Sequence, residues 1–443
     1  MKTNCSKAIV AVVALIILGG LFLRVYIVNE SFVIGPLRSD ALEYYSYSQN
    51  LKEFGVYSRQ SRQLVVDGTE LVHDAHRNPG YVAFLLPFTE YPPDYEMLKK
   101  VRMTQVLISV LSLFVGIMFF KSFLSWPAAL GALLLLTLSP HMASMNNYIL
   151  SESLFIFFLL LSGLVFSYHI RSESISSAIM LGVIIGLALL VRPTILYFPF
   201  LMLILIKKVS LRRKLLVITA FMVGFFSMYG PWMIWKQHSV PESKDPNLMV
   251  MTIQKGMYPN LMYKGDSRTF GYPNKIDPQW SKRNTLSAVA SEIKRRVSAE
   301  PEKYLRWYIL GKPAIFFSWN ILVGQGDVLV YPVEDSPFFR NRLVFAIHEA
   351  MYHLHWPAII LALISSILIW IPGVSRSVSE KTVSPVRFCS LLILYFILVH
   401  LVGTPLPRYS IPVYPFIYAM AMFMLTLIYS FALSFNSKGK QEV

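Results

Sequence analysis

Residues 8–28, which read AIVAVVALIILGGLFLRVYIV, decide the fold class of this chain. The run has about the 20 apolar residues that a helix needs to cross a lipid bilayer. Lys2 and Lys7 precede it, as in a signal peptide, but the run continues through residues 21–28 and contains no Ala-x-Ala cleavage site. We therefore expect an uncleaved membrane anchor here.

The composition of the whole chain agrees with a membrane location. The 443 residues include 41 Lys and Arg against 25 Asp and Glu, and 55% are hydrophobic. Only 15% are charged and the mean hydropathy is +0.51, whereas soluble domains carry about 25% charge. With two cysteines in addition, these values exclude an ordinary cytosolic enzyme, a disordered chain and a disulfide-rich scaffold.

Further apolar runs follow the first one along the chain. Those near full length lie at about 101–120, 126–145, 148–168, 214–236, 343–371, 386–404 and 410–433, and two shorter runs at 175–191 and 194–208 are separated by Arg192-Pro193. The sequence predicts an all-α integral membrane protein with about ten transmembrane helices.

Basic residues in short loops set the expected orientation, because Lys and Arg are retained on the cytosolic side. The basic loops hold Lys2 and Lys7; Lys121; Arg171; Lys207, Lys208, Arg212, Arg213 and Lys214; Arg376, Lys381 and Arg387; and Lys438 and Lys440. We expect an N-terminal transmembrane part at 1–236 with a first outer loop at 29–100, an outer (periplasmic) segment at 237–342, and a C-terminal transmembrane part at 343–443. Positions near Asn274 and Asn341 should then be reachable from outside.

Residues 307–319 form an apolar stretch within the second outer segment. A crossing there would invert every later loop and move its basic residues outside. We therefore expect a helix that lies in the outer interface. Its expected headgroup contacts are Lys303, Arg306 and Lys312, and its expected aromatic anchors are Trp307 and Trp319.

Few motifs point to nucleotide or metal chemistry. The chain has no G-x-x-x-x-G-K-[ST], which argues against an ATP-driven pump. His348 and His353 are five residues apart, not the four of a zinc protease motif, and are interpreted as interfacial residues at the start of a span. His73 and His76 are weak candidates for a divalent metal site, and the alternative is a solvated polar turn.

Residues 38–58, RSDALEYYSYSQNLKEFGVYS, follow the first span directly. Positions 41, 44, 45, 48 and 51 form one helical stripe, and Gly55 is a typical helix end, so the segment predicts a short juxtamembrane helix. Asp40 and Glu43 have the spacing of a capping box, in which Asp40 would accept from the helix N-terminal amides.

The same segment carries a family resemblance. It contains three short motifs in order: Asp40-Ala41-x-x-Tyr44, Asn50-Leu51 and Gly55-x-Tyr57-Ser58. Together they resemble the first outer loop of the glycosyltransferase C superfamily, above all bacterial enzymes similar to protein O-mannosyltransferases and to the lipid A aminoarabinose transferase. Further matches follow in the same order: Arg77-Asn78-Pro79-Gly80-Tyr81, Arg102-Met103-Thr104-Gln105, Leu150-Ser151-Glu152-Ser153-Leu154-Phe155, Arg192-Pro193-Thr194, Pro231-Trp232, and Pro407-Arg408-Tyr409 followed by Pro412 and Pro415.

The resemblance implies inverting transfer of one sugar from a polyprenyl-phosphate donor to an acceptor at the outer face of the membrane. In this superfamily the loop-one aspartate is catalytic, which carries over to Asp40. Many relatives have Glu directly after that aspartate, whereas here Ala41 follows and Glu43 is the next acid. Glu43 is therefore the candidate for a second acid.

Several cations lie where a lipid phosphate would be bound. Arg192 and Arg408 fall at the outer ends of spans, and Lys99, Lys100 and Arg102 fall at an outer boundary, contrary to the positive-inside bias. A leaving phosphate needs fixed cations because its charge grows in the transition state. The alternative for each is a side chain that reaches the lipid headgroups. The substrate-binding candidates are Tyr44, Arg77, Tyr81, Glu152 and Tyr409, and for Glu152 a structural pair with an outer arginine is the alternative.

We therefore expect a multi-pass glycosyltransferase of the bacterial inner membrane with its active site facing the periplasm. Its partners would be a polyprenyl-phosphate sugar donor, a lipid, glycan or protein acceptor and membrane lipids, but no nucleic acid. No cofactor is required by this chemistry, and a divalent metal is optional. A non-enzymatic lipid or polysaccharide transporter is the alternative, and it would need polar residues through the bilayer midplane.

Overall fold

Long apolar helices make up most of the computed structural model, which describes residues 2–205, 210–242, 247–261, 285–321 and 325–439. Within these ranges seven helices are long and apolar enough to cross a membrane, or eight if a bent pair counts as one span, and two shorter apolar helices accompany them. The full-length helices are α1 (Lys2–Glu30), α5 (Tyr95–Lys121), α8 (Glu152–Ser172), α11 (Leu211–Ser239), α18 (Arg342–Leu368), α20 (Glu380–Val402) and α21 (Tyr414–Gly439). The all-α membrane fold predicted from the sequence is confirmed.

Each of the ten predicted apolar runs is largely helical where the structure describes it, but three of them are short or broken. The shorter elements are the bent pair α6 (Trp126–Leu138) and α7 (Pro140–Ser144), then α9 (Ile175–Val191), and α10 (Phe198–Met202) between 3-10 turns at 193–195 and 203–205. The bent pair turns by 49° at its break, because Pro140 has no backbone N–H to continue the helix. The last carbonyls of α6 bind Arg24 of α1 instead: its guanidinium donates to Thr137 O at 3.1 Å and to Leu136 O at 3.3 Å.

Glycines allow the closest helix pair, α9 and α11, to pack tightly. A Cβ atom at Gly182 would lie 2.0 Å from the carbonyl oxygen of Phe221, and one at Gly224 would lie 2.1 Å from that of Ile179. Only a residue without a side chain fits at either position, as is common where membrane helices approach closely. This contact fixes α9, whose end carries Arg192.

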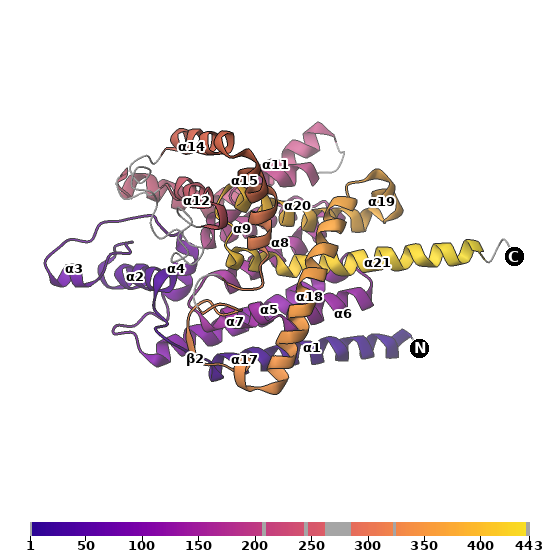
Figure 1. Ribbon diagram of the computed structural model, residues 1–443, viewed down its shortest axis with the longest axis horizontal. Coiled ribbons are helices and arrows are strands. Elements are labelled where there is room, and N and C mark those ends of the chain that lie inside the picture. Colours follow the sequence, from indigo (N-terminus) through magenta and orange to yellow (C-terminus); the bar gives the residue numbers. More distant parts are fainter. Residues whose placement is uncertain (1, 206–209, 243–246, 262–284, 322–324, 440–443) are drawn as a thin grey trace.

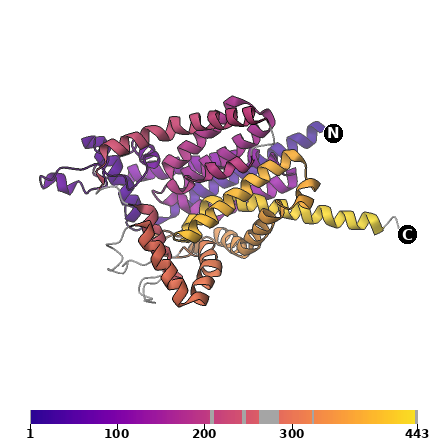
Figure 2. The same ribbon diagram turned by 90° about the horizontal axis from the view of Figure 1, so that it is seen from above.

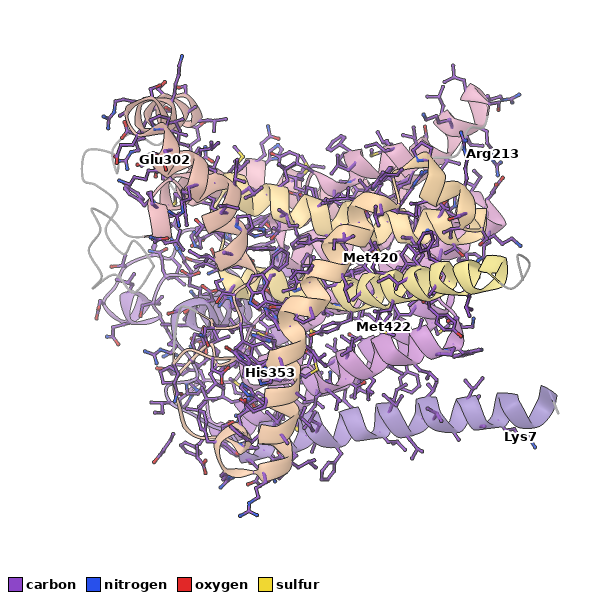
Figure 3. The ribbon with its side chains drawn as sticks, turned by 45° about the vertical axis from the view of Figure 1, so that its right-hand side comes forward. Lys7, Arg213, Glu302, His353, Met420 and Met422 are labelled. Carbon is purple, nitrogen blue, oxygen red and sulfur yellow. The ribbon has the colours of Figure 1, made fainter. Side chains whose placement is uncertain are left out.

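The two termini lie at the same end of the helix bundle, and the elements of both segments predicted to lie outside, 29–100 and 237–342, lie toward the opposite end (Figures 1 and 2). We keep the names first and second outer segment for these two ranges. Lys7 and Arg213, from two of the basic segments, lie near the first end, and Glu302 near the second (Figure 3). Lys207, Lys208, Lys440 and Asn274 lie outside the described residues.

The smaller elements are β1 (Phe32–Val33), α2 (Ser39–Phe54), α3 (Gln63–Val66), α4 (Pro79–Leu85), α12 (Leu248–Gly256), α14 (Leu286–Ala299), α15 (Pro301–Arg306), α16 (Lys312–Phe316), β2 (Val333–Asp335), α17 (Pro337–Arg340) and α19 (Pro372–Ser377).

The two outer segments are joined to one another. Strands β1 and β2 pair antiparallel, with Phe32 opposite Asp335 and Val33 opposite Val333. The chain that leaves α1 is therefore held against the end of the second outer segment shortly before α2 begins. This pairing brings residues near 331 to the N-terminus of α2.

Residues 307–319 are helical over 307–316 and expose Ile309 and Leu310, but several contacts differ from those that the sequence predicted. A π-helical turn (Trp307–Gly311) leads into α16, and Trp307, Lys312 and Trp319 are buried in the protein. The Lys312 ammonium donates to the carbonyl oxygens of Leu401 at 2.6 Å and Gly403 at 2.9 Å. The predicted headgroup contact of Lys312 and the two tryptophan anchors are therefore wrong, because this stretch packs onto the end of α20.

Candidate active site

Helix α2 presents Asp40 in its first turn. It runs from Ser39 to Phe54 and ends at Gly55, whose φ of 67° places it in the left-handed region, as the sequence predicted. The N-cap position is Arg38 and no side chain caps the helix. The capping box predicted for Asp40 and Glu43 is therefore wrong: Asp40 lies two positions beyond the N-cap, and its oxygens bind arginines.

The amide end of α2 is bound instead by a tyrosine from the second outer segment. The Tyr331 hydroxyl accepts from the Ala41 N–H at 3.4 Å and donates to the Arg38 carbonyl at 3.1 Å. No sequence signal pointed to Tyr331, because it lies 290 residues from Ala41 along the chain and reaches it through the β1–β2 pairing. It fixes the turn that carries Asp40.

The Asp40 carboxylate lies between two guanidinium groups. Arg77 Nη2 donates to its Oδ1 at 2.7 Å, and Arg408 Nη2 donates to its Oδ2. Burial raises the pKa of the Asp40 carboxyl, but the positive charges and hydrogen bonds of Arg408 and Arg77 outweigh burial and hold the pKa well below its ordinary value. Asp40 is therefore ionised across the physiological pH range, and a quarter of its side chain remains exposed.

Glu43 lies one helical turn from Asp40 and shares the same arginine. Its Oε2 accepts from Arg77 Nε at 2.7 Å, and its Oε1 lies 3.3 Å from Arg59 Nη1. The ring of His76 is 3.6 Å away. Burial lowers the pKa of His76 to about 4, so this ring is neutral at pH 7 and adds no charge to the site.

The motif at 77–81 is positioned by the end of α9. Asn78 Nδ2 donates to the Leu189 carbonyl at 2.8 Å, and a Cβ atom at Gly80 would lie 2.6 Å from the Leu190 carbonyl carbon. This close backbone approach requires glycine and sets Arg77 beside Asp40. It also places the Tyr81 ring edge-on to Tyr44, with centroids 4.8 Å apart.

Glu152 joins the two predicted phosphate-binding arginines. Its side chain is 1% exposed, and its Oε1 lies 2.7 Å from Arg192 Nη1 and 3.1 Å from Arg408 Nε. The alternative prediction, a pair with an outer arginine, is thus observed. At these distances the two ion pairs are charge-assisted contacts that hold both guanidinium groups against the buried carboxylate.

The site is therefore a chain of alternating charges from five parts of the sequence. In order, it runs Arg192, Glu152, Arg408, Asp40, Arg77 and Glu43. The Tyr409 ring lies beside the two arginines that flank Glu152. Its centroid is 5.4 Å from the Arg192 guanidinium and 5.8 Å from that of Arg408. We call this arrangement the ion-pair chain.

The basic cluster predicted to bind phosphate has other partners in the described structure. Helix α5 begins at Tyr95, so Lys99, Lys100 and Arg102 lie in its first two turns rather than in a loop. Lys100 pairs with Glu90 at 3.5 Å on the surface, and Arg102 Nε donates to its own helix at Leu98 O, 3.4 Å away.

The histidine candidates also have protein partners. His73 Nδ1 accepts from the Tyr57 N–H at 2.9 Å, and the His348 ring lies 2.9 Å from Asp327, not next to His353. Among the described residues, no three His, Cys, Asp or Glu side chains are grouped so as to hold a metal ion.

Comparisons with known proteins place this site in a family context. Residues 70–238 match the family model of dolichyl-phosphate-mannose-protein mannosyltransferase, a range that includes Arg77, Glu152 and Arg192 but neither Asp40 nor Arg408. Among solved structures, the archaeal oligosaccharyltransferase AglB from Archaeoglobus fulgidus, in complex with an inhibitory peptide and a dolichol-phosphate, matches with 12% identity and a TM-score of 0.50. The match covers 98% of this chain and 52% of AglB, so this chain spans about half the length of that protein.

A second structure, ArnT from Cupriavidus metallidurans bound to undecaprenyl phosphate, matches with 12% identity over 96% of this chain and 78% of that one, with a TM-score of 0.39. A search of curated protein sequences finds no match. The family match and the AglB fold confirm the resemblance to membrane glycosyltransferases of the glycosyltransferase C type.

Proposed function

We propose that this protein transfers a sugar from a polyprenyl-phosphate donor to an acceptor hydroxyl at the outer face of a bacterial inner membrane, with inversion at the anomeric carbon. The observation that carries the proposal is the Asp40 carboxylate held between Arg77 and Arg408, with Arg408 linked through Glu152 to Arg192. It sets an ionised acid next to a pair of cations, as this reaction requires.

Arg192 and Arg408 are assigned to the donor phosphate. Both arginines are held by Glu152, whose Oε1 lies 2.7 Å from Arg192 Nη1 and 3.1 Å from Arg408 Nε, so two guanidinium groups converge on one point. A phosphate oxygen is a stronger acceptor for guanidinium than a neutral group and can be bound by two nitrogens at once. As the bond to the sugar breaks, negative charge grows on the phosphate, and removing one such preorganised donor typically costs about 3 kcal/mol of transition-state stabilisation.

The reaction balances without an added oxidant, reductant or nucleotide. The acceptor oxygen forms a bond to the anomeric carbon while the bond from that carbon to the phosphate oxygen breaks, and the polyprenyl phosphate leaves with the electron pair. Asp40 accepts the proton of the acceptor hydroxyl, a contribution of about 10²- to 10⁴-fold. Glu43 positions Arg77, and through it Asp40.

Donor binding would also change the basicity of Asp40. In the absence of donor, Arg408 stabilises the Asp40 anion, which makes it a weak base. A bound phosphate would share the positive charge of Arg408 and so weaken this stabilisation. The proton affinity of Asp40 would then rise only when the donor is in place.

The proposal needs no metal, since arginines supply the positive charge that a divalent ion would otherwise provide. Transfer by the purified protein should therefore survive treatment with EDTA, and rescue of an EDTA-inactivated enzyme by added Mg²⁺ or Mn²⁺ would contradict this part.

The activity can be tested in the cell. Mass analysis of envelope glycolipids and glycoproteins, from cells with and without the chain, should reveal a sugar-bearing product that depends on it. Complementation with Asp40→Asn should fail to restore the product. An unchanged envelope in the absence of the chain would contradict the proposal.

The outer location predicts accessible sites near β2. Glu334 is exposed and free of the capping role that Asn341 has at α18. In a background with Cys5 and Cys389 replaced by Ser, a membrane-impermeant maleimide should label Glu334→Cys in intact cells. Labelling only after permeabilisation would place this segment in the cytosol.

A further inference from the structure

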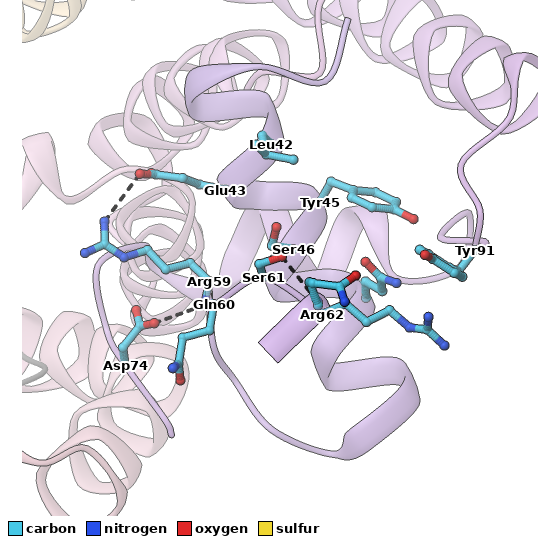
Figure 4. Close-up of a pocket in the computed structure, with 12 residues that line it drawn as sticks. Leu42, Glu43, Tyr45, Ser46, Arg59, Gln60, Ser61, Arg62, Asp74 and Tyr91 are labelled. Carbon is cyan, nitrogen blue, oxygen red and sulfur yellow. Dashed lines mark hydrogen bonds and ion pairs between the residues drawn. The ribbon is translucent and has the colours of Figure 1, made fainter. Parts of the chain in front are cut away.

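A pocket opens beside the ion-pair chain, on the face of α2 next to the one that carries Asp40. It lies between α2 and the loop at 59–63 (Figure 4). The residues that line it are Leu42, Glu43, Tyr45, Ser46, Gln49, Arg59, Gln60, Ser61, Arg62, Gln63, Asp74 and Tyr91. In Figure 4, Glu43 and Arg59 lie on one side, Tyr45 and Tyr91 on the other, and Ser46 and Ser61 between them. We call it the α2 pocket.

Glu43 connects the α2 pocket to the ion-pair chain. It lines the pocket, and its Oε2 lies 2.6 Å from Arg77 Nη2, the same nitrogen that donates to Asp40 at 2.7 Å. The two carboxylates are therefore separated by one nitrogen atom. A molecule seated in the pocket would end next to the carboxylate that we assign as the base.

The charges of the pocket are already compensated within the protein. Arg59 pairs with Glu43 at 3.3 Å, and Arg62 pairs with Glu53 at 2.8 Å while its guanidinium covers the Tyr91 ring at 3.9 Å. Asp74 accepts from the Arg59 backbone N–H at 3.0 Å. Two acids and two bases line the pocket, so it offers no net charge that would attract a phosphate or a basic peptide.

The remaining surface is neutral and polar. It consists of two serine hydroxyls, three glutamine amides and the rings of Tyr45 and Tyr91, and the Tyr91 side chain is 52% exposed. Peptides are usually bound by a sheet edge, an apolar groove or an arginine cluster. Among the lining residues only Leu42 is aliphatic and none lies in a strand. Hydroxyls and amides next to aromatic rings match a molecule rich in hydroxyl groups.

We propose that the α2 pocket binds the acceptor, and that the acceptor is a neutral glycan whose attacking hydroxyl extends past Glu43 to Asp40. This assignment rests on the proposed function, and it selects the glycan among the lipid, glycan and protein acceptors that the sequence left open.

Filling the pocket tests the assignment. Ser46→Trp fills it from α2, and Ser61→Trp fills it from the exposed loop, where a fold defect is least expected. Phe54→Trp is the matched control, because Phe54 ends the same helix, is 38% exposed and does not line the pocket. Each variant would be expressed in cells that lack the chain, and the envelope product quantified by mass analysis. Purified protein in nanodiscs would report the melting temperature with and without undecaprenyl phosphate.

Both pocket variants should lower the product at least tenfold, roughly the loss that follows when a substrate is moved from its productive position. They should keep the wild-type melting temperature and its increase with undecaprenyl phosphate, while Phe54→Trp keeps the product. Normal product from Ser46→Trp and Ser61→Trp would overturn the acceptor site. A wild-type protein that neither binds undecaprenyl phosphate nor forms the product would instead count against the proposed function.

The class of acceptor can be read directly from a crosslink. Benzoylphenylalanine at Ser61, activated by light in growing cells, should attach to material that releases sugar fragments in tandem mass spectrometry. Benzoylphenylalanine at Phe54 gives the background. Crosslinks that carry only peptide, or that do not exceed this background, would overturn the glycan assignment.

Discussion

Two pairs of largely buried cations in the described structure differ in their partners. Arg24 and Lys312 are fully buried and bind backbone carbonyls at helix ends. Arg192 and Arg408 are nearly as buried but bind carboxylates. Carbonyls at a helix end have no hydrogen-bond partner within the helix, so a cation that binds them has a structural role. A carboxylate carries charge of its own, so the second group can exchange partners when an anionic ligand arrives.

We propose that the type of partner atom, rather than burial or position, separates structural cations from those that bind the donor. Arg24 closes the break between α6 and α7, and Lys312 fixes the second outer segment to the end of α20. An ionisable residue within a membrane protein is by default interpreted as part of a functional site, and this rule would assign Arg24 and Lys312 to one. The partner atom, not the depth, tells them apart.

The largest expected effect comes from removing charge at the centre of the ion-pair chain. Asp40→Asn keeps the shape of the side chain but removes the proton acceptor, so transfer should fall by at least about 100-fold. The melting temperature should fall because the ion pairs with Arg77 and Arg408 are weakened, so transfer is measured below that temperature and per amount of folded protein. Purified protein assayed with a radiolabelled lipid-linked donor gives both values.

Glu43→Gln is the control for Asp40→Asn, with a smaller expected loss because Glu43 acts through Arg77. An Asp40→Asn enzyme that transfers at the wild-type rate would remove Asp40 from the catalytic role.

The second prediction sets one cation of each group against the other. Arg408→Ala removes a guanidinium group that we assign to the phosphate of the sugar donor. Loss of one such hydrogen-bond donor typically costs about 3 kcal/mol, so kcat/KM should fall about 100-fold. Arg24→Met leaves carbonyls of α6 unpaired at a cost of about 1–3 kcal/mol, which should lower the melting temperature while the folded fraction keeps its kcat/KM. The reverse pattern, a stable inactive Arg24→Met and an active Arg408→Ala, would invert the assignment of the two groups.

Arg192→Ala should behave like Arg408→Ala, since the two arginines share Glu152. Wild-type transfer by the purified Arg192→Ala protein would return this arginine to a headgroup contact.

The third prediction concerns the backbone that places the carboxylate-bound cations. Gly80→Ala adds a Cβ atom 2.6 Å from the Leu190 carbonyl carbon, so α4 must move and take Arg77 with it. A displacement of about 1 Å can cost up to 100-fold in rate, and we expect about a tenfold loss in kcat. Gly19→Ala, where no atom lies within 4 Å, is the matched control. Equal activity of both variants would show that the contact with α9 does not position Arg77.

The sequence predicted the helical fold and several site residues because these depend on local patterns. Apolar run length located the spans, and the stripe at 41–51 with Gly55 located α2. The site residues Asp40, Arg77, Glu152, Arg192 and Arg408 came from motifs, and the structure brings all five together.

What the sequence could not supply were contacts between distant segments. The capping box was wrong because the helix begins two residues earlier than the pattern predicted, which makes Asp40 a partner of arginines rather than a cap. Lys312 and Trp319 were placed in the interface because no local pattern reveals that 307–319 packs on α20. Tyr331 was missed because only the β1–β2 pairing brings it to α2.

The smallest expected effect is on the pH dependence, and it again separates the two groups. A carboxyl whose pKa is held below its ordinary value stays ionised as the pH falls. Its ability to accept a proton from the acceptor is lost only when the pH falls below the lowered pKa. In kcat/KM, which reports the free enzyme, Asp40 should therefore produce no acid limb between pH 5 and 8, because an ordinary aspartate already titrates near pH ~4. Arg77→Met removes one of the cations that lower this pKa, so the acid limb should move to higher pH. Lys312→Met removes a cation that binds carbonyls and should leave the limb where it is. A shift with Lys312→Met, or none with Arg77→Met, would show that the carboxylate-bound cations do not set the ionisation of Asp40.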